Sequence, residues 1–401
     1  MGITGLYSVL KKECPEQLVT YKFSELAGFR ISVDISIFLY KYVCTAGEGW
    51  MNLFILLLCM LKKHGIKVVC VFDGQKSVPP EKRMEQEARR KSRQKQITRL
   101  QESIRLRNLI QDKYYDPDIT LPEDLKEECK MLICPRKGKI PDMTNYEDPG
   151  DIANSLNRVI ERIEKQTITI TDNHKNIAIE IVKMMGLSVY EAYGEAETVC
   201  AHLAIEGEVD AVLTEDTDVL AYGCPLMFAF KDFSLSEEKL YGLHHSSIIE
   251  ALEMTPEEFQ DLCILLRCDY NRHNRDGQSQ IVKGYPPDGK NRKKPVGIGK
   301  VGALAMIREY RRMEEVVKYI ENPEPLIYER CRELFTIPEW MKNETPPIPF
   351  NGPLDEEKIK DLIRKYNLSL SLEYIKSFWK PVKVFIGSDS EDSLSDDGFE
   401  E

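Results

Sequence analysis

Carboxylates follow several short apolar runs of this chain, and their positions suggest a metal site. Asp34 ends one apolar run and Asp73 follows another. The stretch VLTEDTDVL at 212–220 places Asp216 and Asp218 between two apolar halves. Acids at the ends of expected strands or helices are Asp34, Asp73, Glu195, Glu197, Asp216, Asp218 and Asp269.

Such a set of acids needs a counter-charge if it gathers in one cleft, because like charges repel strongly at low dielectric. Oxygen ligands without His or Cys favour Mg²⁺ or Mn²⁺ over zinc, and two ions roughly 3.5–4 Å apart suit phosphodiester hydrolysis. Each acid alone has a simpler interpretation. Asp34 or Asp73 could be a loop residue or a helix N-cap, and Asp216 with Asp218 could form a turn or a calcium loop that lacks the other EF-hand ligands.

The elements that must position these acids are predicted by alternating patterns. Short apolar runs at 30–33, 67–72, 187–190 and 210–213 read as strands, and helical patterns separate them. This alternation predicts an α/β fold with a parallel sheet flanked by crossover helices. Ligands of such sheets lie outside the carboxyl ends of the strands, so the acids should meet at one edge.

Three helices are expected outside that alternation. Residues 79–112 are polar, rich in helix formers and free of interior glycine, which predicts a long helix with little to bury. Residues 53–61 read as a core helix too short to span a bilayer. Residues 255–266 begin with Thr-Pro-Glu-Glu, a typical N-terminal signal of an amphipathic helix.

Charge is distributed unevenly over the 401 residues, whose formal net charge is −11. Residues 76–107 hold eleven Lys/Arg against four Glu, and residues 270–296 hold seven Lys/Arg against two Asp. Residues 387–401 hold seven acids and no base, which predicts a disordered tail. Residues 114–154 contain several prolines and predict an irregular insertion. The eleven scattered cysteines indicate a reducing, intracellular compartment.

An ordered series of motifs resembles that of the flap endonucleases and related structure-specific 5′ nucleases of the xeroderma type. The resemblance covers roughly residues 1–110 and 165–320; it does not cover 114–154, 270–296 or the chain after about 325. The motifs, in order, are MGITGL, VDIS, VFDG, YGEAETVCA, TEDTD, DLCILLRCDY and GIGKVGALAMI.

The resemblance implies a PIN-like nuclease core with a twisted parallel sheet, a helical arch insertion and a helix-hairpin-helix element that binds duplex. The expected organisation is a nuclease region at 1–112 that includes the basic arch helix, an irregular arch or cap insertion at 113–165, and a second nuclease region at 166–325 with the helix-hairpin-helix. A helical extension at 326–386 and the acidic tail at 387–401 would follow.

The resemblance also implies roles for the charged residues. In the family, acids at the positions of the seven carboxylates hold two Mg²⁺ ions, directly or through water, and Mn²⁺ is expected to substitute. Lys82 and Arg89, two helical turns apart, would grip the scissile phosphate. A solvated helix face is the alternative for these two cations, and a stronger one for Arg90, Lys91 and Arg93, which we also expect to bind DNA.

Further DNA contacts are implied at both ends of the nuclease core. Tyr40 corresponds to an aromatic residue on which the family stacks a base, although a core tyrosine would give the same sequence. Gly2 matches a glycine near the site, although a buried N-terminal strand is an equal alternative. Gly297, Gly299 and Lys300 resemble the phosphate-tracking loop of the helix-hairpin-helix, where K⁺ is often bound. Arg267 and Cys268 replace the small residues usual before the acid at Asp269, and the basic 270–296 stretch is an addition; both departures count against the family's K⁺ site and duplex geometry.

The sequence therefore predicts a Mg²⁺-dependent 5′ nuclease that cuts DNA at 5′ flaps or single-strand/duplex junctions by two-metal catalysis, in replication or repair. A double-strand 5′→3′ exonuclease and a junction resolvase are alternatives within the superfamily, and an inactive DNA-binding scaffold is a remote one. Expected partners are branched or nicked DNA, without a membrane or a sliding-clamp motif in the tail, and the protein is expected to be a monomer. Localisation in the nucleus, or at a host nucleus or replication site if the protein is viral, is implied by the family.

Overall fold

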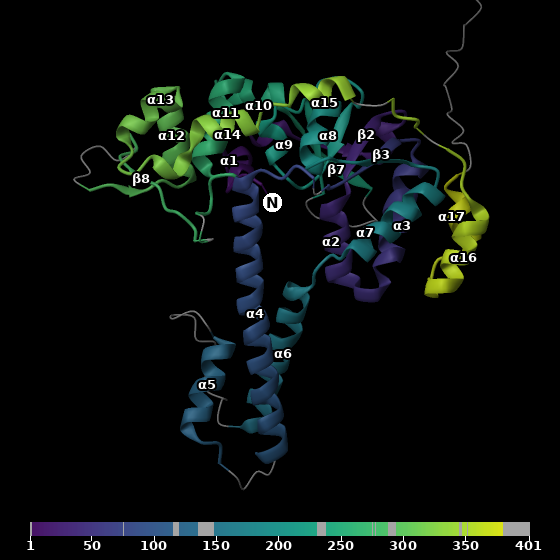
Figure 1. Ribbon diagram of the computed structural model, residues 1–401, viewed down its shortest axis with the longest axis vertical. Coiled ribbons are helices and arrows are strands. Elements are labelled where there is room, and N and C mark those ends of the chain that lie inside the picture. Colours follow the sequence, from purple (N-terminus) through teal and green to yellow (C-terminus); the bar gives the residue numbers. More distant parts are fainter. Residues whose placement is uncertain are drawn as a thin grey trace, which may run out of the picture.

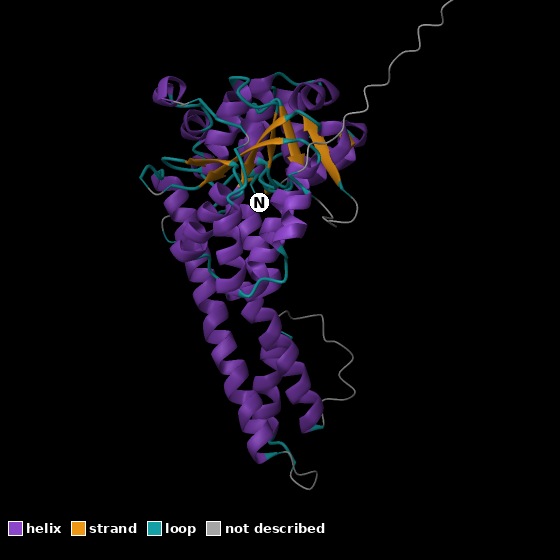
Figure 2. Ribbon diagram, turned by 90° about the vertical axis from the view of Figure 1, so that its right-hand side faces the viewer, coloured by secondary structure: helices purple, strands orange, loops and turns teal. Residues whose placement is uncertain are grey.

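A central mixed sheet organises the molecule, and helices cover both of its faces (Figures 1 and 2). The computed structural model describes residues 2–74, 76–114, 120–134, 148–230, 238–274, 276, 278–287, 294–344, 347–350 and 352–379. Within these residues, seven strands pair in the order β1-β7-β6-β5-β2-β3-β4. The strands are β1 Leu18–Lys22, β2 Arg30–Asp34, β3 Lys67–Phe72, β4 Ser188–Glu191, β5 Ala211–Leu213, β6 Leu226–Ala229 and β7 Lys239–His244.

Strands β6, β5, β2, β3 and β4 are parallel, and β7 runs antiparallel between β6 and β1. The parallel part confirms the α/β fold expected from the sequence. The strands expected at 30–33, 67–72, 187–190 and 210–213 are present as β2, β3, β4 and β5. Their adjacency in the sheet brings the carboxyl ends of β5, β2, β3 and β4 to one edge.

The sheet separates two large apolar cores, because successive side chains of a strand point to opposite faces. On β3, Val69 and Val71 belong to one buried cluster, whereas Val68, Cys70 and Phe72 belong to the other. Burial on both faces explains why the parallel strands read as continuous apolar runs.

Helices of the body pack on these two faces. One stretch, Ile35–Lys63, is long and apolar enough to cross a membrane by length and composition alone. The turn at Gly47–Gly49 divides it into α2 and α3, and both helices contribute to one buried core cluster. The helices of the body are α1 Leu6–Glu13, α2 Ile35–Ala46, α3 Trp50–Lys63, α7 Asp172–Met184, α8 Ala196–Ile205, α9 Asp218–Ala221, α10 His245–Leu252 and α11 Pro256–Leu266.

A helical arch projects from the body (Figure 1). It consists of α4 Pro80–Lys113, α5 Glu123–Ile133 and α6 Pro149–Thr167. At 34 residues, α4 is about 50 Å long at 1.5 Å per residue. Its outer half is stabilised by a small separate core with α5 and α6, whose buried members are Leu106, Ile110, Leu121, Cys129, Ile152, Ala153 and Leu156.

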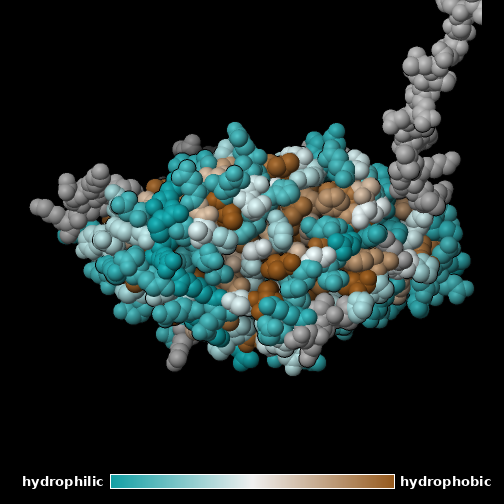
Figure 3. Space-filling view, turned by 90° about the horizontal axis from the view of Figure 1, so that it is seen from above, coloured by the Kyte–Doolittle hydropathy of each residue, from teal (hydrophilic) through white to brown (hydrophobic). Residues whose placement is uncertain are grey.

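The remaining elements flank the body. The short strands β8 Lys283–Gly284 and β9 Val296–Gly297 precede α12 Lys300–Tyr310. Viewed from the side opposite the arch, hydrophobic residues are scattered among hydrophilic ones (Figure 3). The other helices are α13 Met313–Val316, α14 Tyr328–Leu334, α15 Glu339–Glu344, α16 Glu356–Tyr366 and α17 Leu372–Ser377.

One expectation about the insertion needs correction. The segment at 113–165 was expected to be irregular, but α5 and most of α6 lie within it. The proline at 149 starts α6 instead of breaking structure, since proline is well tolerated in the first turn of a helix. The helices expected at 79–112 and 255–266 are present as α4 and α11, and the tail at 387–401 lies outside the described residues.

Candidate active site

Several of the acids lie at the ends of strands that meet at one edge of the sheet. Asp34 is the last residue of β2, Asp73 follows β3, and Asp216 lies between β5 and α9. Because β5, β2 and β3 are neighbours in the sheet, these three carboxylates converge at its carboxyl edge. Glu195 and Glu197 lie at the start of α8, just after β4, and Asp269 follows α11.

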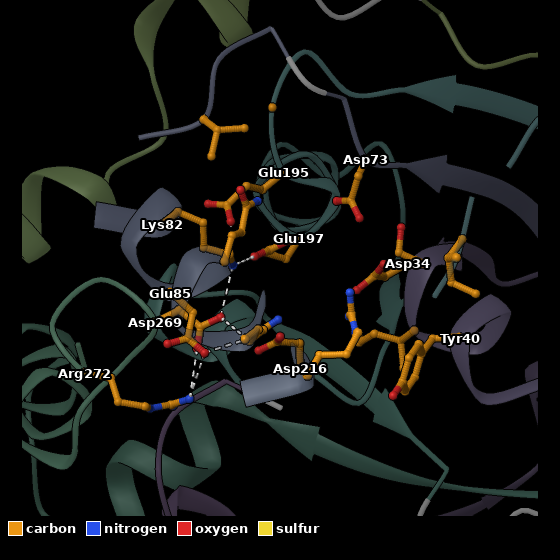
Figure 4. Close-up of a pocket in the computed structure, with 18 of the residues that line it drawn as sticks. Asp34, Tyr40, Asp73, Lys82, Glu85, Glu195, Glu197, Asp216, Asp269 and Arg272 are labelled. Atoms are coloured by element: carbon orange, nitrogen blue, oxygen red, sulfur yellow. Dashed lines mark hydrogen bonds and ion pairs between the residues drawn. The ribbon is translucent and has the colours of Figure 1, made fainter. Parts of the chain in front are cut away.

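The acids face a cavity of about 820 Å³ between the sheet edge and the base of α4. Figure 4 shows its side chains converging from the strand ends, α4 and α8. Asp218, at the start of α9, completes the set, because ligand oxygens of Glu197, Asp216 and Asp218 lie within 4.8 Å of one another. Of the seven acids expected to gather, those that line the cavity are Asp34, Asp73, Glu195, Glu197, Asp216 and Asp269.

Several of these carboxylates are buried with too few hydrogen bonds and cations to offset the cost of burying their charge. Within the described residues, neither carboxylate oxygen of Asp218 has a hydrogen-bond partner, and its side chain is fully buried. Burial, together with Asp216 and Asp269, raises the pKa of Asp218 well above its usual value. Burial and the neighbouring Asp73 do the same to the pKa of Asp34. Oxygen atoms in this state are the kind of donors that bind hard divalent cations.

Lys82 partly neutralises the acids. Its ammonium nitrogen lies 2.5 Å from Glu195 Oε1, 3.0 Å from Glu197 Oε1 and 3.2 Å from Asp269 Oδ2. Burial would lower the pKa of Lys82, but these acids outweigh burial and raise it well above its usual value. The lysine is therefore charged, and it is only 8% exposed.

Arg89 lies two turns further along α4, on the same side of the helix. Its Nε donates to Glu85 Oε1 at 2.8 Å, and its Nη2 donates to Asp269 Oδ2 at 2.8 Å. Lys82, Arg89 and Arg272 together outweigh the effect of burial and hold the pKa of Asp269 below its usual value. The base of the arch is thus tied to the acidic cavity by cations.

Sequence reasoning missed three residues of this cavity region: Glu85, Arg272 and His273. Glu85 is 3% exposed, forms ion pairs with Arg89 and Arg272, and contacts His273 Nδ1. Its position between Lys82 and Arg89, three residues after one and four before the other, was a usable signal. Arg272 and His273 lie in the basic 270–296 stretch, but their partners on α4 are far away in sequence.

Gly2 packs against the loop that carries Asp216. This position favours a place beside the site over the alternative of a buried N-terminal strand. A Cβ on Gly2 would lie 2.1 Å from Asp216 Oδ1 and 2.8 Å from the Thr217 nitrogen, and the residue has φ +82°. The next residue, Ile3, donates its backbone N–H to Thr217 Oγ1 at 3.0 Å. The start of the chain therefore packs directly beside a candidate metal ligand.

Of the residues near the arch that were expected to contact DNA, some line the cavity and others do not. Tyr40 lines the cavity and is 39% exposed, so it is not a core tyrosine. Arg93 also lines the cavity. Arg90 points elsewhere and pairs with Glu87, while Lys91 Nζ donates to the backbone oxygen of Asp276 at 2.8 Å.

The expected phosphate-tracking loop lies outside the acidic cavity. Gly297 ends β9, Gly299 is the N-cap of α12, and Lys300 is its first residue. A Cβ on Gly299 would meet nothing within 4 Å, so the backbone there is open to an approaching group. Arg267, the C-cap residue of α11 before Asp269, adopts φ +82°, an unusual conformation for a residue with a side chain. The roles of all these residues in binding DNA or K⁺ stay predictions.

Two protein-family models match the chain. The N-terminal domain of the XPG family matches residues 1–97, and the XPG I-region matches residues 186–269. All seven acids fall within these two matches, with Asp269 as the last residue of the second, and Lys82 and Arg89 fall within the first.

Curated relatives align over nearly the whole chain. Flap endonuclease 1 of Yarrowia lipolytica is 27% identical over 393 residues, covering 92% of this chain and 85% of the relative. Flap endonuclease 1-A of Oryza sativa subsp. japonica is 27% identical over 424 residues, covering 95% of this chain and 91% of the relative.

Solved structures share the fold. The catalytic core of Rad2 in complex with DNA substrate superposes with a TM-score of 0.60 at 16% identity, covering 94% of this chain and 99% of that one. Flap endonuclease-1 from Methanococcus jannaschii superposes with a TM-score of 0.51 at 15% identity, covering 90% of this chain and 94% of that one. The mixed sheet with flanking helices is therefore an established architecture.

Proposed function

The chain belongs to the flap endonuclease family of nucleases, and from that membership we propose that it is a Mg²⁺-dependent structure-specific 5′ nuclease. It hydrolyses DNA phosphodiester bonds at 5′ flaps or other single-strand/duplex junctions. The observation that carries this proposal is the cavity in which strand-end acids face Lys82 and Arg89 of the arch helix.

The residues present fit a pair of Mg²⁺ ions. Glu197, Asp216 and Asp218 have oxygens close enough for one shared ion, and both oxygens of Asp218 lack a hydrogen-bond partner in the described chain. Asp34, Asp73, Glu195 and Asp269 supply further oxygens around the same cavity, directly or through water. Bound Mg²⁺ would supply Lewis-acid stabilisation of charge at the scissile phosphate.

The cations of α4 would bind and orient the substrate. Lys82 and Arg89 are held by carboxylates that would hold metal, so metal entry would leave Lys82 in need of another anion and would free the Arg89 Nη2 from Asp269, while Arg89 keeps Glu85. A DNA phosphate is such an anion, and charge-assisted hydrogen bonds from Lys and Arg offset the negative charge that grows on it during hydrolysis.

Two further features support a junction substrate. Tyr40, exposed at the cavity, offers a stacking surface for a base next to the cut, and such stacking contributes about 1–3 kcal/mol. The arch formed by α4, α5 and α6 projects from the body (Figure 1), residues of α4 line the cavity, and such an arch is suited to a single-stranded 5′ end. The matched Rad2 structure is a complex with DNA substrate, which supports the same class of ligand.

We infer the cellular setting from the relatives. Because the matched curated proteins are eukaryotic flap endonucleases, we place this enzyme in nuclear DNA replication or repair, acting on branched or nicked DNA. Mn²⁺ would substitute for Mg²⁺, since both prefer oxygen ligands.

The substrate is tested with end-labelled 5′-flap, nicked, gapped, Holliday-junction and blunt duplex DNA in Mg²⁺, with EDTA as a control. We expect a dominant cut at the base of the flap, leaving 5′-phosphate and 3′-hydroxyl ends. Laddering from blunt or nicked ends would instead assign the protein to the exonuclease branch, and symmetric cuts in the Holliday junction would assign it to the resolvases. DNA binding without any cleavage would leave only the scaffold alternative.

A further inference from the structure

Arg272 enters the active-site cavity from a segment that the motif series does not cover. It follows Asp269 by three residues and is the first basic residue in the stretch at 270–296. Its side chain lines the cavity beside Asp269 and Glu85, where Figure 4 shows it at the edge opposite Asp73. Among the described residues that line this cavity, seven carboxylates face four cations, and Arg272 is one of the four.

The guanidinium of Arg272 is fixed in position from two sides. Its Nη2 donates to the backbone oxygen of Gly2 at 2.5 Å. Its Nη1 lies 3.2 Å from Asp269 Oδ1 and 3.7 Å from Glu85 Oε1. The backbone contact does not depend on ionised groups, so the guanidinium stays at the cavity even when its carboxylate partners change.

Those carboxylate partners are shared with other cations. Asp269 holds Lys82, Arg89 and Arg272 at once. If Asp269 binds metal, as the proposed function requires, it can no longer compensate three organic cations as well. Arg272 then has spare donor capacity, and its Nε is already buried without an acceptor among the described residues.

We propose that Arg272 is a third phosphate-binding cation of the active site, which contacts the cut strand at or next to the scissile phosphate together with Lys82 and Arg89. This inference rests on the proposed nuclease function. A guanidinium presents a rigid fork of donors that matches phosphate oxygens, and the side chain is 25% exposed toward the cavity. A purely structural clamp between Gly2, Asp269 and Glu85 is the competing account.

Two variants and a matched control separate these accounts: Arg272→Gln, Arg272→Lys and Arg364→Gln. Arg364 lies on α16, and its side chain is 68% exposed and remote from the cavity. Each full-length protein is compared with wild type in single-turnover cleavage of a 5′-flap substrate at saturating Mg²⁺. Flap binding is then measured by anisotropy in Ca²⁺ at several salt concentrations, with intact DNA verified on a denaturing gel.

We expect Arg272→Gln to slow single-turnover cleavage roughly 10²-fold, the lower end of the effect of losing one donor to a developing oxyanion. Its plot of log Kd against log salt should lose a slope of about one, the signature of one missing phosphate contact. Arg272→Lys should retain the salt slope and lose less rate, because it keeps the charge without the fork. Arg364→Gln should match wild type in both measurements.

The opposite pattern would overturn the inference. An unchanged salt slope in Arg272→Gln, with a lower thermal midpoint or a higher Mg²⁺ requirement, would assign Arg272 to a structural clamp. Unchanged rate and slope would remove it from the site altogether. Misfolding of Arg272→Gln, seen by circular dichroism, leaves Arg272→Lys as the deciding variant, and a loss of its salt slope would contradict the proposal. If wild type cleaves no substrate, the proposed function fails first, and that result is distinct from these.

Discussion

At the scale of single residues, Lys82 is the cation that pairs with three of the site acids at once. Replacing it in Lys82→Ala leaves Glu195, Glu197 and Asp269 without their shared ammonium. We expect single-turnover cleavage of flap DNA to fall by roughly 10²–10³-fold, the usual effect of removing one group that stabilises transition-state charge. Lys358→Ala, an exposed lysine on α16, is the matched control and should leave the rate unchanged. Equal rates for Lys82→Ala and wild type would refute a role for this lysine.

Gly2 gives a steric test of the same site. In Gly2→Ala the new Cβ would lie 2.1 Å from Asp216 Oδ1, so this carboxylate or the start of the chain must shift. We expect a higher Mg²⁺ concentration for half-maximal cleavage. Gly28→Ala is the control, because Gly28 also has positive φ but has open space around its Cβ position. If both variants shift the Mg²⁺ midpoint equally, backbone strain and not contact with Asp216 is the cause.

The raised carboxylate pKa values predict how metal binding depends on pH. Burial and Glu197 raise the pKa of Asp216 to about 6 and that of Glu195 to about 8. Unfolded carboxyls ionise near about pH 4, so the folded metal-free protein binds more protons and loses stability as pH rises from about 4 to about 8. Mg²⁺ binds the ionised forms and reverses this loss.

Mg²⁺ should therefore raise the thermal midpoint more at pH 8 than at pH 6. Differential scanning fluorimetry with and without Mg²⁺ at both values measures the increment, and Asp216→Asn should show a smaller one. An increment that is equal at the two pH values, or larger at pH 6, would mean that these acids do not bind the ion.

Some of these residues were predictable from the sequence and others were not. The seven acids stood out because each follows an apolar run or opens a helix, and the parallel sheet brings such positions together. Glu85 and Arg272 did not stand out, because their roles arise from an ion pair across 187 residues of chain. Charge patterns within one helix are visible in a sequence, but contacts between distant segments are fixed only by the fold.

At the scale of elements, the arch has a core of its own, which makes its stability separable from that of the body. Leu156 on α6 is fully buried among residues of α4 and α5 and belongs to neither large cluster. Leu156→Ala should cost about 2–5 kcal/mol of local stability. We expect faster hydrogen exchange in α4, α5 and α6 and slower flap cleavage, with unchanged exchange in β2 and β3.

The matched comparison is Leu57→Ala, which removes the same side chain from the core of the body. It should accelerate exchange in the sheet and lower the global thermal midpoint. Uniform exchange changes in Leu156→Ala would show that arch and body unfold as one unit.

Strands were predicted correctly from the sequence where both of their faces are buried. β3 is buried on both faces, so its apolar run was clear. β1 gave no such signal because all of its residues are partly buried or exposed. The short β6 and the antiparallel β7 were also missed. The helices α5 and α6 were hidden by flanking prolines, although α6 has an apolar side that fits the arch core.

At the scale of the whole molecule, the charge is segregated. The protein is acidic overall, with a net charge of −11, yet eleven basic residues fall within positions 76–107. Binding of flap DNA should therefore weaken steeply with salt, by at least roughly 10-fold between about 50 and 200 mM, because phosphate contacts release counterions. Fluorescence anisotropy in Ca²⁺ measures this, and affinity independent of salt would contradict a basic DNA-binding face.

The most direct test of the central claim is single-turnover cleavage of an end-labelled 5′-flap by wild type and by Asp216→Asn, each with its flap affinity measured in parallel. Wild type should cut in Mg²⁺ and not in EDTA. Asp216→Asn should lose cleavage by several orders of magnitude while its Kd stays within a few-fold, since Asp216 is only 7% exposed and the substitution removes none of the cations that would bind phosphate. Undiminished cleavage by Asp216→Asn would contradict the claim that this carboxylate cluster is the catalytic metal site.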